Sequence, residues 1–148
     1  MKKIKIVFTA IVMLLTTAAF ASDDNNVSEK VKAAFKTDFA MASQVTWEKN
    51  SDFYFASFWL NQVKVDAAYN EEGELVGTSR KITTEQLPLS LSLELSKKYA
   101  AYKISTTAYE LNYEGQTSYY LSADNSKQVL NLKCSANGYI ETESRTKK

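Results

Sequence analysis

An internal repeat constrains this chain more than any other feature of its sequence. Residues 27–38 carry apolar side chains at helical spacing, and a second helical stripe follows at residues 88–99. After each stripe come four segments in which apolar and polar residues alternate, as they do in half-buried β-strands. One helix followed by four strands, repeated once, predicts an α+β protein with antiparallel sheets.

The expected strands are short and are separated by turn-forming residues. Turns are expected at 50–52, 61–62 and 70–73 in the first half and around 114–115, 124–126 and 136–138 in the second. Pro88 suits the first turn of the second helix, where its missing N–H costs nothing. The strands are expected at residues 45–48, 53–60, 63–69 and 75–82, then at 103–113, 117–123, 128–135 and 139–144.

Residue identities support the repeat at an offset of 65 positions, although the two helices align poorly at this offset. The matched pairs are Gly73 with Gly138, Leu75 with Ile140, Ser79 with Ser144, Arg80 with Arg145, Tyr54 with Tyr119, Val65 with Leu130 and Ala67 with Leu132. A half of about 60 residues buries too little apolar surface to be more than marginally stable on its own. We therefore predict a tandem repeat of one helix plus a four-stranded antiparallel sheet, with repeats at 27–84 and 85–145 that share a sheet or a tight interface.

The N-terminus has the layout of a secretory signal peptide. Lys2, Lys3 and Lys5 precede an apolar stretch at residues 6–20, and Ala19-Phe20-Ala21 is an A-x-A cleavage site. A membrane anchor would need about 20 apolar residues, more than this stretch provides. We expect cleavage after Ala21, which removes residues 1–21.

The export signal predicts a periplasmic or secreted protein that is not stably inserted in the membrane after cleavage. Ser22, rather than a cysteine, follows the cleavage site, which argues against a lipid-modified N-terminus. Residues 22–26 are polar and acidic, and we expect them to form a disordered lead-in.

Composition excludes several classes of function. The 148 residues include no histidine and one cysteine, Cys134, which removes histidine-based catalysis, histidine metal ligands and intrachain disulfides. Cys134 alternates with Leu130 and Leu132, so we expect a buried thiol rather than a reactive one. The formal net charge of +1 leaves no electrostatic footprint for nucleic acid. We expect no metal and no cofactor.

The remaining routes to catalysis are weak. A serine–lysine pair could replace a histidine-based triad. However, the one S-x-x-K match in the sequence runs from Ser144 to Lys147, in what we expect to be a flexible tail. The acidic residues at 71–74 surround a turn, and the segment 124–126 is too short for a calcium loop. Four scattered glycines form no phosphate-binding loop. We predict that the protein is not an enzyme and has no catalytic residues.

The positive signal is aromatic. Side chains of the segment 53–60 alternate between two faces, and only one face can lie against a helix. We expect Tyr54, Ala56 and Phe58 to point inward, which places Phe53, Phe55 and Trp59 on the open face. The set of candidate partner-binding residues is Phe53, Phe55, Trp59 and Tyr120. Exposed aromatics in a row often mark a binding face, while cover by a second layer, a dimer or the other half remains the alternative.

Several short motifs resemble a known family. They are Val45-Thr46-Trp47, Tyr54-Phe55-Ala56-Ser57-Phe58, Ala68-Tyr69 leading into Gly73, Leu87-Pro88 before the second helix, Tyr119-Tyr120-Leu121, and Leu130-Asn131-Leu132 followed by Gly138. Together they resemble the β-lactamase-inhibitor-like, PepSY-like proteins secreted by Bacteroidetes. Ala40 departs from the pattern, because such sequences often carry proline there.

The resemblance implies a fold rather than an activity. It implies a tandem helix-plus-sheet module whose concave sheet face grips an enzyme, and PepSY domains are thought to restrain proteases. It carries over no catalytic residue. We therefore expect a secreted, non-catalytic binding or inhibitor-like module that engages a periplasmic or envelope protein through an open sheet face. The alternative is a small-ligand carrier or sensor with an aromatic pocket. The sequence does not determine the oligomeric state.

Overall fold

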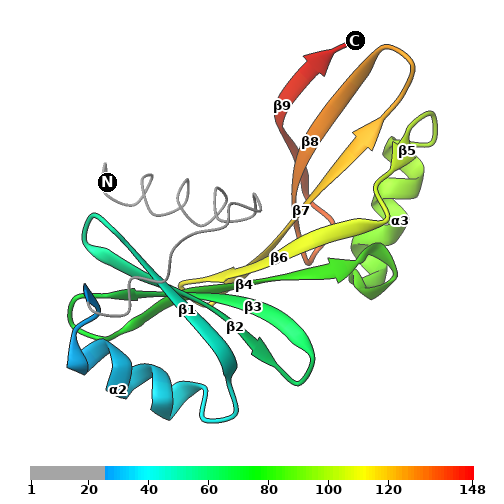
Figure 1. The fold of residues 1–148 in the computed structure, drawn as a ribbon. Coiled ribbons are helices and arrows are strands. Elements are labelled where there is room, and N and C mark those ends of the chain that lie inside the picture. Colours follow the sequence, from blue (N-terminus) through cyan, green and yellow to red (C-terminus); the bar gives the residue numbers. More distant parts are fainter. Residues whose placement is uncertain (1–25) are drawn as a thin grey trace. The chain divides into compact units, whose positions relative to one another are not determined.

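The computed structural model describes residues 26–148, and Figure 1 shows each α-helix of this part with the strands that follow it. The signal peptide expected at residues 1–21 lies outside the described residues, as does nearly all of the lead-in expected at 22–26. Neither helix of the described chain combines the length and the hydrophobicity that a membrane crossing requires.

The first helix and its strands form close to where the sequence places them. Helix α2 (Glu29–Asp38) begins where the Ser28 hydroxyl accepts a hydrogen bond of 3.3 Å from the backbone N–H of Val31. The strands after it are β1 (Ser43–Asn50), β2 (Phe53–Leu60), β3 (Val63–Asn70) and β4 (Leu75–Thr83). A two-residue turn joins β2 to β3, and its Asn61 and Gln62 both have positive φ, as a tight hairpin requires.

The second helix and its strands differ from the prediction in two places. The elements are the 3₁₀ turn η2 (Thr84–Gln86), α3 (Leu89–Lys98), β5 (Lys103–Ile104), β6 (Thr107–Tyr113), β7 (Gln116–Asp124), β8 (Gln128–Ser135) and β9 (Ile140–Lys147). Pro88 is the residue before the first turn of α3 rather than part of it.

The strand expected at 103–113 is in fact two strands, β5 and β6. The break falls at Ser105, whose hydroxyl donates to the Thr107 carbonyl at 2.8 Å and accepts from the Ser122 N–H at 3.2 Å. A side chain that bonds the backbone on both sides replaces the regular ladder at this point, which is why alternation alone did not reveal it.

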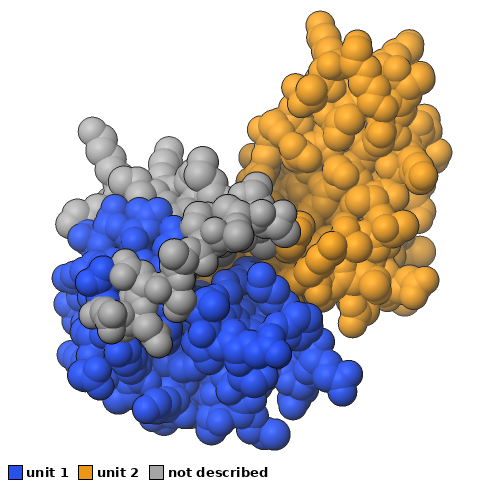
Figure 2. Space-filling model, in the orientation of Figure 1, with its two compact units in different colours: residues 1–79 blue, residues 80–148 orange. Residues whose placement is uncertain are grey.

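All strands belong to one nine-stranded sheet, which confirms the predicted fold class. Eight follow the order β1-β2-β3-β4-β6-β7-β8-β9, and β5 pairs with β7. The pairs with described register are antiparallel, for example Ala56 of β2 opposite Ala67 of β3. The chain divides into two compact units, one ending at Ser79 and the other running from Arg80 to Lys148, coloured blue and orange in Figure 2. Each unit has its own core.

The core of the first unit is mainly aromatic. Phe35 of α2 packs edge-on against Trp47 of β1 and Phe58 of β2, with ring centroids 5.2 and 5.0 Å apart. The hydroxyl of the fully buried Tyr69 donates a 2.8 Å hydrogen bond to Asp38 at the end of α2. Burial, and next the Asp38 carboxylate, raise the pKa of Tyr69. The predicted inward set of β2, Tyr54, Ala56 and Phe58, lies in this core.

The core of the second unit is mainly aliphatic. Leu91 and Leu95 of α3 are buried against β7 and β8, together with the side chain of Cys134. The burial expected for Cys134 is confirmed, because its side chain is 1% exposed.

The repeat is real but has two offsets. The bond from Phe39 N–H to the Phe35 carbonyl has its counterpart from Tyr99 to Leu95, an offset of 60. The turn bond from Gly73 N–H to the Asn70 carbonyl has its counterpart from Gly138 to Ser135, an offset of 65. The second unit therefore gains five residues between its helix and its last turn. This insertion explains why the helices align poorly at the offset that matches the strands.

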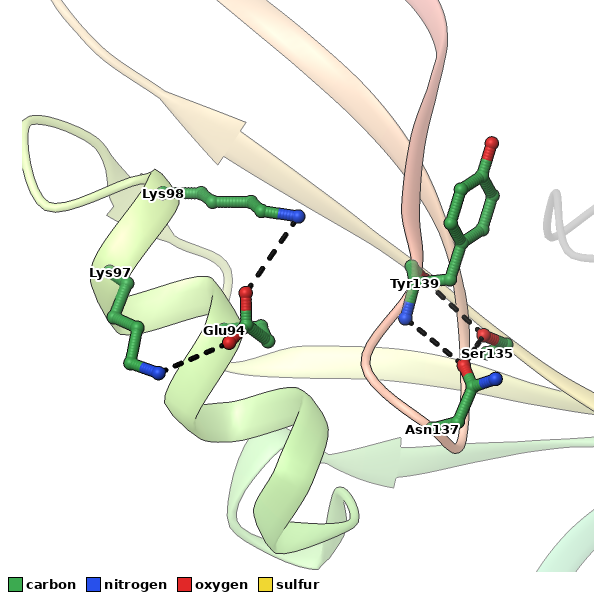
Figure 3. A network of polar contacts seen from close by, with 6 residues as sticks. All are labelled: Glu94, Lys97, Lys98, Ser135, Asn137 and Tyr139. Atoms are coloured by element: carbon green, nitrogen blue, oxygen red, sulfur yellow. Dashed lines mark hydrogen bonds and ion pairs between the residues drawn. The ribbon is translucent and has the colours of Figure 1, made fainter.

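A glycine turn touches the helix in each unit. A Cβ at Gly73 would lie 3.3 Å from the Lys30 carbonyl oxygen of α2, and one at Gly138 would lie 3.1 Å from Glu94 Cγ of α3. Both glycines have positive φ. The approach of the β8–β9 turn to α3 is visible in Figure 3.

Polar contacts hold the Gly138 turn in shape. Asn137 accepts a hydrogen bond from the Tyr139 N–H at 3.1 Å, and the Ser135 hydroxyl also bonds to Asn137 (Figure 3). On the helix, Glu94 pairs with Lys97 and Lys98 at 3.2 and 3.7 Å, and these cations lower the pKa of Glu94 (Figure 3). The turn and the helix surface that it meets are thus each fixed by their own contacts.

We expect Gly138→Ala to destabilise the protein more than Gly115→Ala does. Both residues have positive φ, but a Cβ at Gly115 meets nothing within 4 Å. Gly115→Ala should lower the free energy of unfolding by about 1 kcal/mol, the cost of a left-handed backbone. Gly138→Ala should cost about 2 kcal/mol, because the contact with α3 adds to that strain. Urea denaturation of the two variants measures both values, and equal losses would contradict the proposed turn–helix contact.

Candidate binding surfaces

The alternation of β2 defines a sheet face turned away from α2. Because Tyr54, Ala56 and Phe58 lie in the core beneath the helix, the intervening side chains point to the other face. These are Phe53, Phe55, Ser57 and Trp59. We call them, with their cross-strand neighbours on the same side, the outer face of the first unit.

Exposure is uneven along the outer face. Trp59 is 41% exposed, Phe53 is partly buried and Phe55 is only 3% exposed. Phe55 occupies the middle of β2 between its register partners Glu48 and Ala68, whereas Trp59 stands near the end of the strand. The row of aromatics that the sequence predicts is therefore present on one face, but its exposed part is Trp59.

The polar groups of the outer face lie beside these aromatics. Ser57 donates a hydrogen bond to Asp66, its register partner on β3. Burial raises the pKa of Asp66, while the Ser57 hydroxyl and Lys64 act in the opposite direction. Lys64 is the register partner of Trp59. A carboxyl group, an ammonium group and an indole thus occupy neighbouring positions on this face.

Tyr120, the fourth candidate, belongs to the second unit. It lies on β7 opposite Tyr109 and Lys133, and the Lys133 ammonium is 6.0 Å from its ring centroid. Its side chain is 8% exposed, and burial raises its pKa, with Glu143 and Glu141 adding to the rise. The neighbours Tyr119 and Leu121 belong to the core beneath α3, so Tyr120 points away from that helix.

A cavity that the sequence reasoning missed lies beside α2. Its volume is about 460 Å³, and it is lined by α2 from Lys32 onward, the segment before β1 and the first half of β1. Lys32 and Lys36 line it together with the aromatic residues Phe35, Phe39 and Trp47. The sequence does contain a signal for this cavity. Lys32 and Lys36 lie four residues apart, and each is followed three residues later by a phenylalanine, Phe35 and Phe39. We interpreted that helix only as a core element.

The structure corrects the reason for dismissing a serine–lysine pair. Ser144 and Lys147 do not lie in a flexible tail, since both belong to β9, which pairs with β8. Ser144 accepts a hydrogen bond of 2.8 Å from Asn131, while Lys147 is the register partner of Gln128. Residues three apart on a strand point to opposite faces. The two side chains therefore cannot act as nucleophile and base.

Cys134 has the properties of a structural thiol. Burial raises its pKa to about 12, so almost no thiolate is present at neutral pH. Within residues 26–148, no three acidic or cysteine side chains converge in a group that could hold a metal ion.

Comparison with known proteins reveals a shared fold. A BLIP-like protein from Bacteroides fragilis is 16% identical, with a TM-score of 0.68 over 85% of this chain and 92% of that chain. The chain has the fold of BLIP-like Bacteroides proteins. DUF2874 family proteins from Bacteroides uniformis and Bacteroides ovatus also reach 0.68, at 15% and 16% identity, over 82% and 87% of this chain and 89% of each of theirs.

A candidate periplasmic protein from Bacteroides eggerthii has the same fold, at 13% identity and a TM-score of 0.68 over 82% of this chain and 88% of that chain. No family model matches the chain, and no curated protein matches it. The resemblance drawn from the sequence motifs is thus confirmed for the fold.

We expect the buried thiol to make stability depend on pH above its ordinary pKa of 9.0. Because the folded-state pKa is higher than the unfolded one, the thiol's contribution is complete below pH 9 and is lost as the pH rises toward 12. The limiting slope is about 1.4 kcal/mol per pH unit. Urea denaturation at pH 8 and pH 10.5 should therefore show a larger loss for the wild type than for Cys134→Val. The same loss in both proteins would show that the thiol is not protected by burial.

Proposed function

We propose that this protein is an exported, non-catalytic binding module that engages a protein of the periplasm or cell envelope through the outer face of its first unit. The observation that carries the proposal is the exposure of Trp59, 41% of whose surface is open on a sheet face turned away from the helix. Phe53 of the same row is partly exposed, whereas Phe55 and Tyr120 are only 3% and 8% exposed and offer a partner little surface.

The physical case for Trp59 rests on burial energy. Covering a large apolar side chain contributes about 1.5–3 kcal/mol, so an indole left in water gains when a partner covers it. Tryptophan is also among the residues that most often dominate binding energy at protein interfaces. Trp59 is the penultimate residue of β2, close to a two-residue turn, a position from which a ring can enter a cleft. The neighbouring Lys64 supplies a polar rim.

The mechanism would be steric occlusion. An antiparallel sheet with a helix on one face leaves its other face available to a partner. The fold shared with a BLIP-like protein supports this role by analogy alone, because a fold does not specify a function. The separation of Ser144 from Lys147 and the high pKa of the Cys134 thiol are consistent with a protein that binds without catalysing.

The alternative function, a small-ligand carrier or sensor, is favoured by a different observation. That observation is the cavity beside α2, whose volume of about 460 Å³ lies within the range of ligand pockets, roughly 300–1,000 Å³. The outer face and the cavity are on opposite sides of the first unit's sheet, so the two functions can be tested separately.

We expect Trp59→Ala to weaken partner capture at least tenfold without unfolding the protein, because the side chain is exposed and lies outside the helix-side core. A photo-crosslinking amino acid at position 64, the exposed register partner of Trp59, should give one discrete adduct in the envelope fraction of the source cells. Adding Trp59→Ala to that variant should reduce the yield of the adduct at least tenfold.

The matched control is Leu89, an apolar residue of the second unit that is 74% exposed. The same crosslinker at position 89 should give no discrete adduct, and Leu89→Ala should leave capture unchanged. Equal adducts from both positions, or capture unaffected by Trp59→Ala, would count against the outer face as the binding surface.

A further inference from the structure

The cavity beside α2 combines an apolar floor with a cationic wall. Trp47 and Phe35 form the floor and are buried in the core, and Phe39 closes the end toward the loop before β1. The ring centroids of Phe35 and Phe39 are 5.5 Å apart, so they form one continuous apolar surface. A ligand body that lies on this surface would be apolar or aromatic.

The wall is formed by two lysines one helical turn apart. Lys32 and Lys36 both line the cavity, and residues four apart on a helix project from the same side. Two like charges at this spacing repel one another, and an anion between them would relieve that repulsion.

The carboxylates nearby leave this positive charge largely uncompensated. Lys32 pairs with Glu29 at 3.4 Å, but Glu29 is almost fully exposed, so the pair is weak. Asp38 accepts the hydrogen bond of Tyr69 instead. Among residues 26–148, no carboxylate lies within ion-pair distance of Lys36. An anionic group would therefore be favoured at the mouth of the cavity.

The second unit has the same helix-and-strand architecture but lacks the two lysines. At the helix offset of 60, Lys32 and Lys36 correspond to Ser92 and Ser96 of α3. Ala42, at the edge of the cavity, corresponds to Tyr102, and the two residues make equivalent backbone bonds, to the carbonyls of Phe39 and Tyr99.

Tyr102 thus places a large side chain at the position where the first unit has Ala42. The Tyr102 ring packs on Tyr99, with centroids 5.6 Å apart, and its hydroxyl accepts a 2.5 Å hydrogen bond from Gln128. At three corresponding positions, the first unit thus has two lysines and a small residue, and the second has two serines and a tyrosine.

We propose that the cavity beside α2 binds a small free amphipathic carboxylate, whose apolar body lies on Phe35, Phe39 and Trp47 and whose carboxylate lies between Lys32 and Lys36. The carboxylate would accept charge-assisted hydrogen bonds from the two ammonium groups. This site is separate from the outer face and does not depend on the binding role proposed for Trp59.

The test uses Trp47 as a reporter inside the site. In protein purified after export of the full chain, Trp59→Phe leaves Trp47 as the single tryptophan of the mature protein. Decanoate should change its fluorescence saturably, and decyltrimethylammonium, which has the same chain length and opposite charge, should bind at least tenfold more weakly. Equal affinity for the two probes, or no saturable change with decanoate below its micellar concentration, would overturn the proposal.

Two variants copied from the second unit locate the site. Lys32→Ser with Lys36→Ser should weaken decanoate binding at least tenfold and abolish the preference over the cationic probe. Ala42→Tyr should abolish binding of both probes by filling the cavity edge. Decanoate binding that neither variant changes would place the ligand elsewhere and overturn the proposal.

A final arm separates a free carboxylate from a lipid surface. Vesicles of phosphatidylglycerol present anionic headgroups whose acyl chains are held in the bilayer, so the protein should not sediment with them. Sedimentation that the double lysine variant abolishes, without decanoate binding by the wild type, would identify a membrane surface instead and refute the proposed ligand.

Discussion

Side chains alternate between the two faces of a β-strand, and this alternation determines which residues of the protein form the core and which are left for binding. A strand under a helix can give only alternate side chains to the core, and β2 gives Tyr54, Ala56 and Phe58. Phe53, Phe55 and Trp59 must then point the other way, whatever covers them. The aromatic content of β2 is therefore divided between stability on one face and the proposed contact on the other. A shift of one residue in register would exchange the two sets and destroy the core.

The two units share one architecture but differ in the side chains that fill their cores. Both have a helix of the same length, the same bond at the helix end and a glycine turn that meets the helix. The first fills its core with aromatic rings around Phe35, and the second uses leucines around Leu91 and Leu95. The cavity beside α2 lies at the edge of the aromatic core, since Phe35 and Trp47 belong to both. The side-chain differences between the repeats, rather than their common backbone, distinguish the proposed site.

Much of the fold could be predicted from sequence because its signals are local. The cap at Ser28, the tight turn at Asn61 and the alternation of β2 and β3 each depend on neighbouring residues. The split at Ser105 could not be predicted in this way, because it depends on bonds to Ser122, a residue of another strand. The repeat itself was visible, but the single offset of 65 concealed the helix offset of 60.

The candidate site was less predictable than the fold. Alternation predicted which aromatics share a face, but it could not predict that Phe55 is buried and Trp59 exposed, because exposure depends on tertiary surroundings. The cavity was missed for a similar reason. Lys32 and Lys36 look like an ordinary solvated helix face until Phe39 and Trp47 are placed beside them.

The difference in exposure between Trp47 on the helix side and Trp59 on the outer face of the first unit is tested most directly by the two tryptophans themselves. Acrylamide quenching of Trp47→Phe reports on Trp59, and quenching of Trp59→Phe reports on Trp47. The structure, with Trp59 41% exposed and Trp47 5% exposed, predicts a quenching constant several-fold larger for Trp59 in the absence of any added ligand. Equal quenching of the two indoles, or stronger quenching of Trp47, would contradict the arrangement on which the account rests.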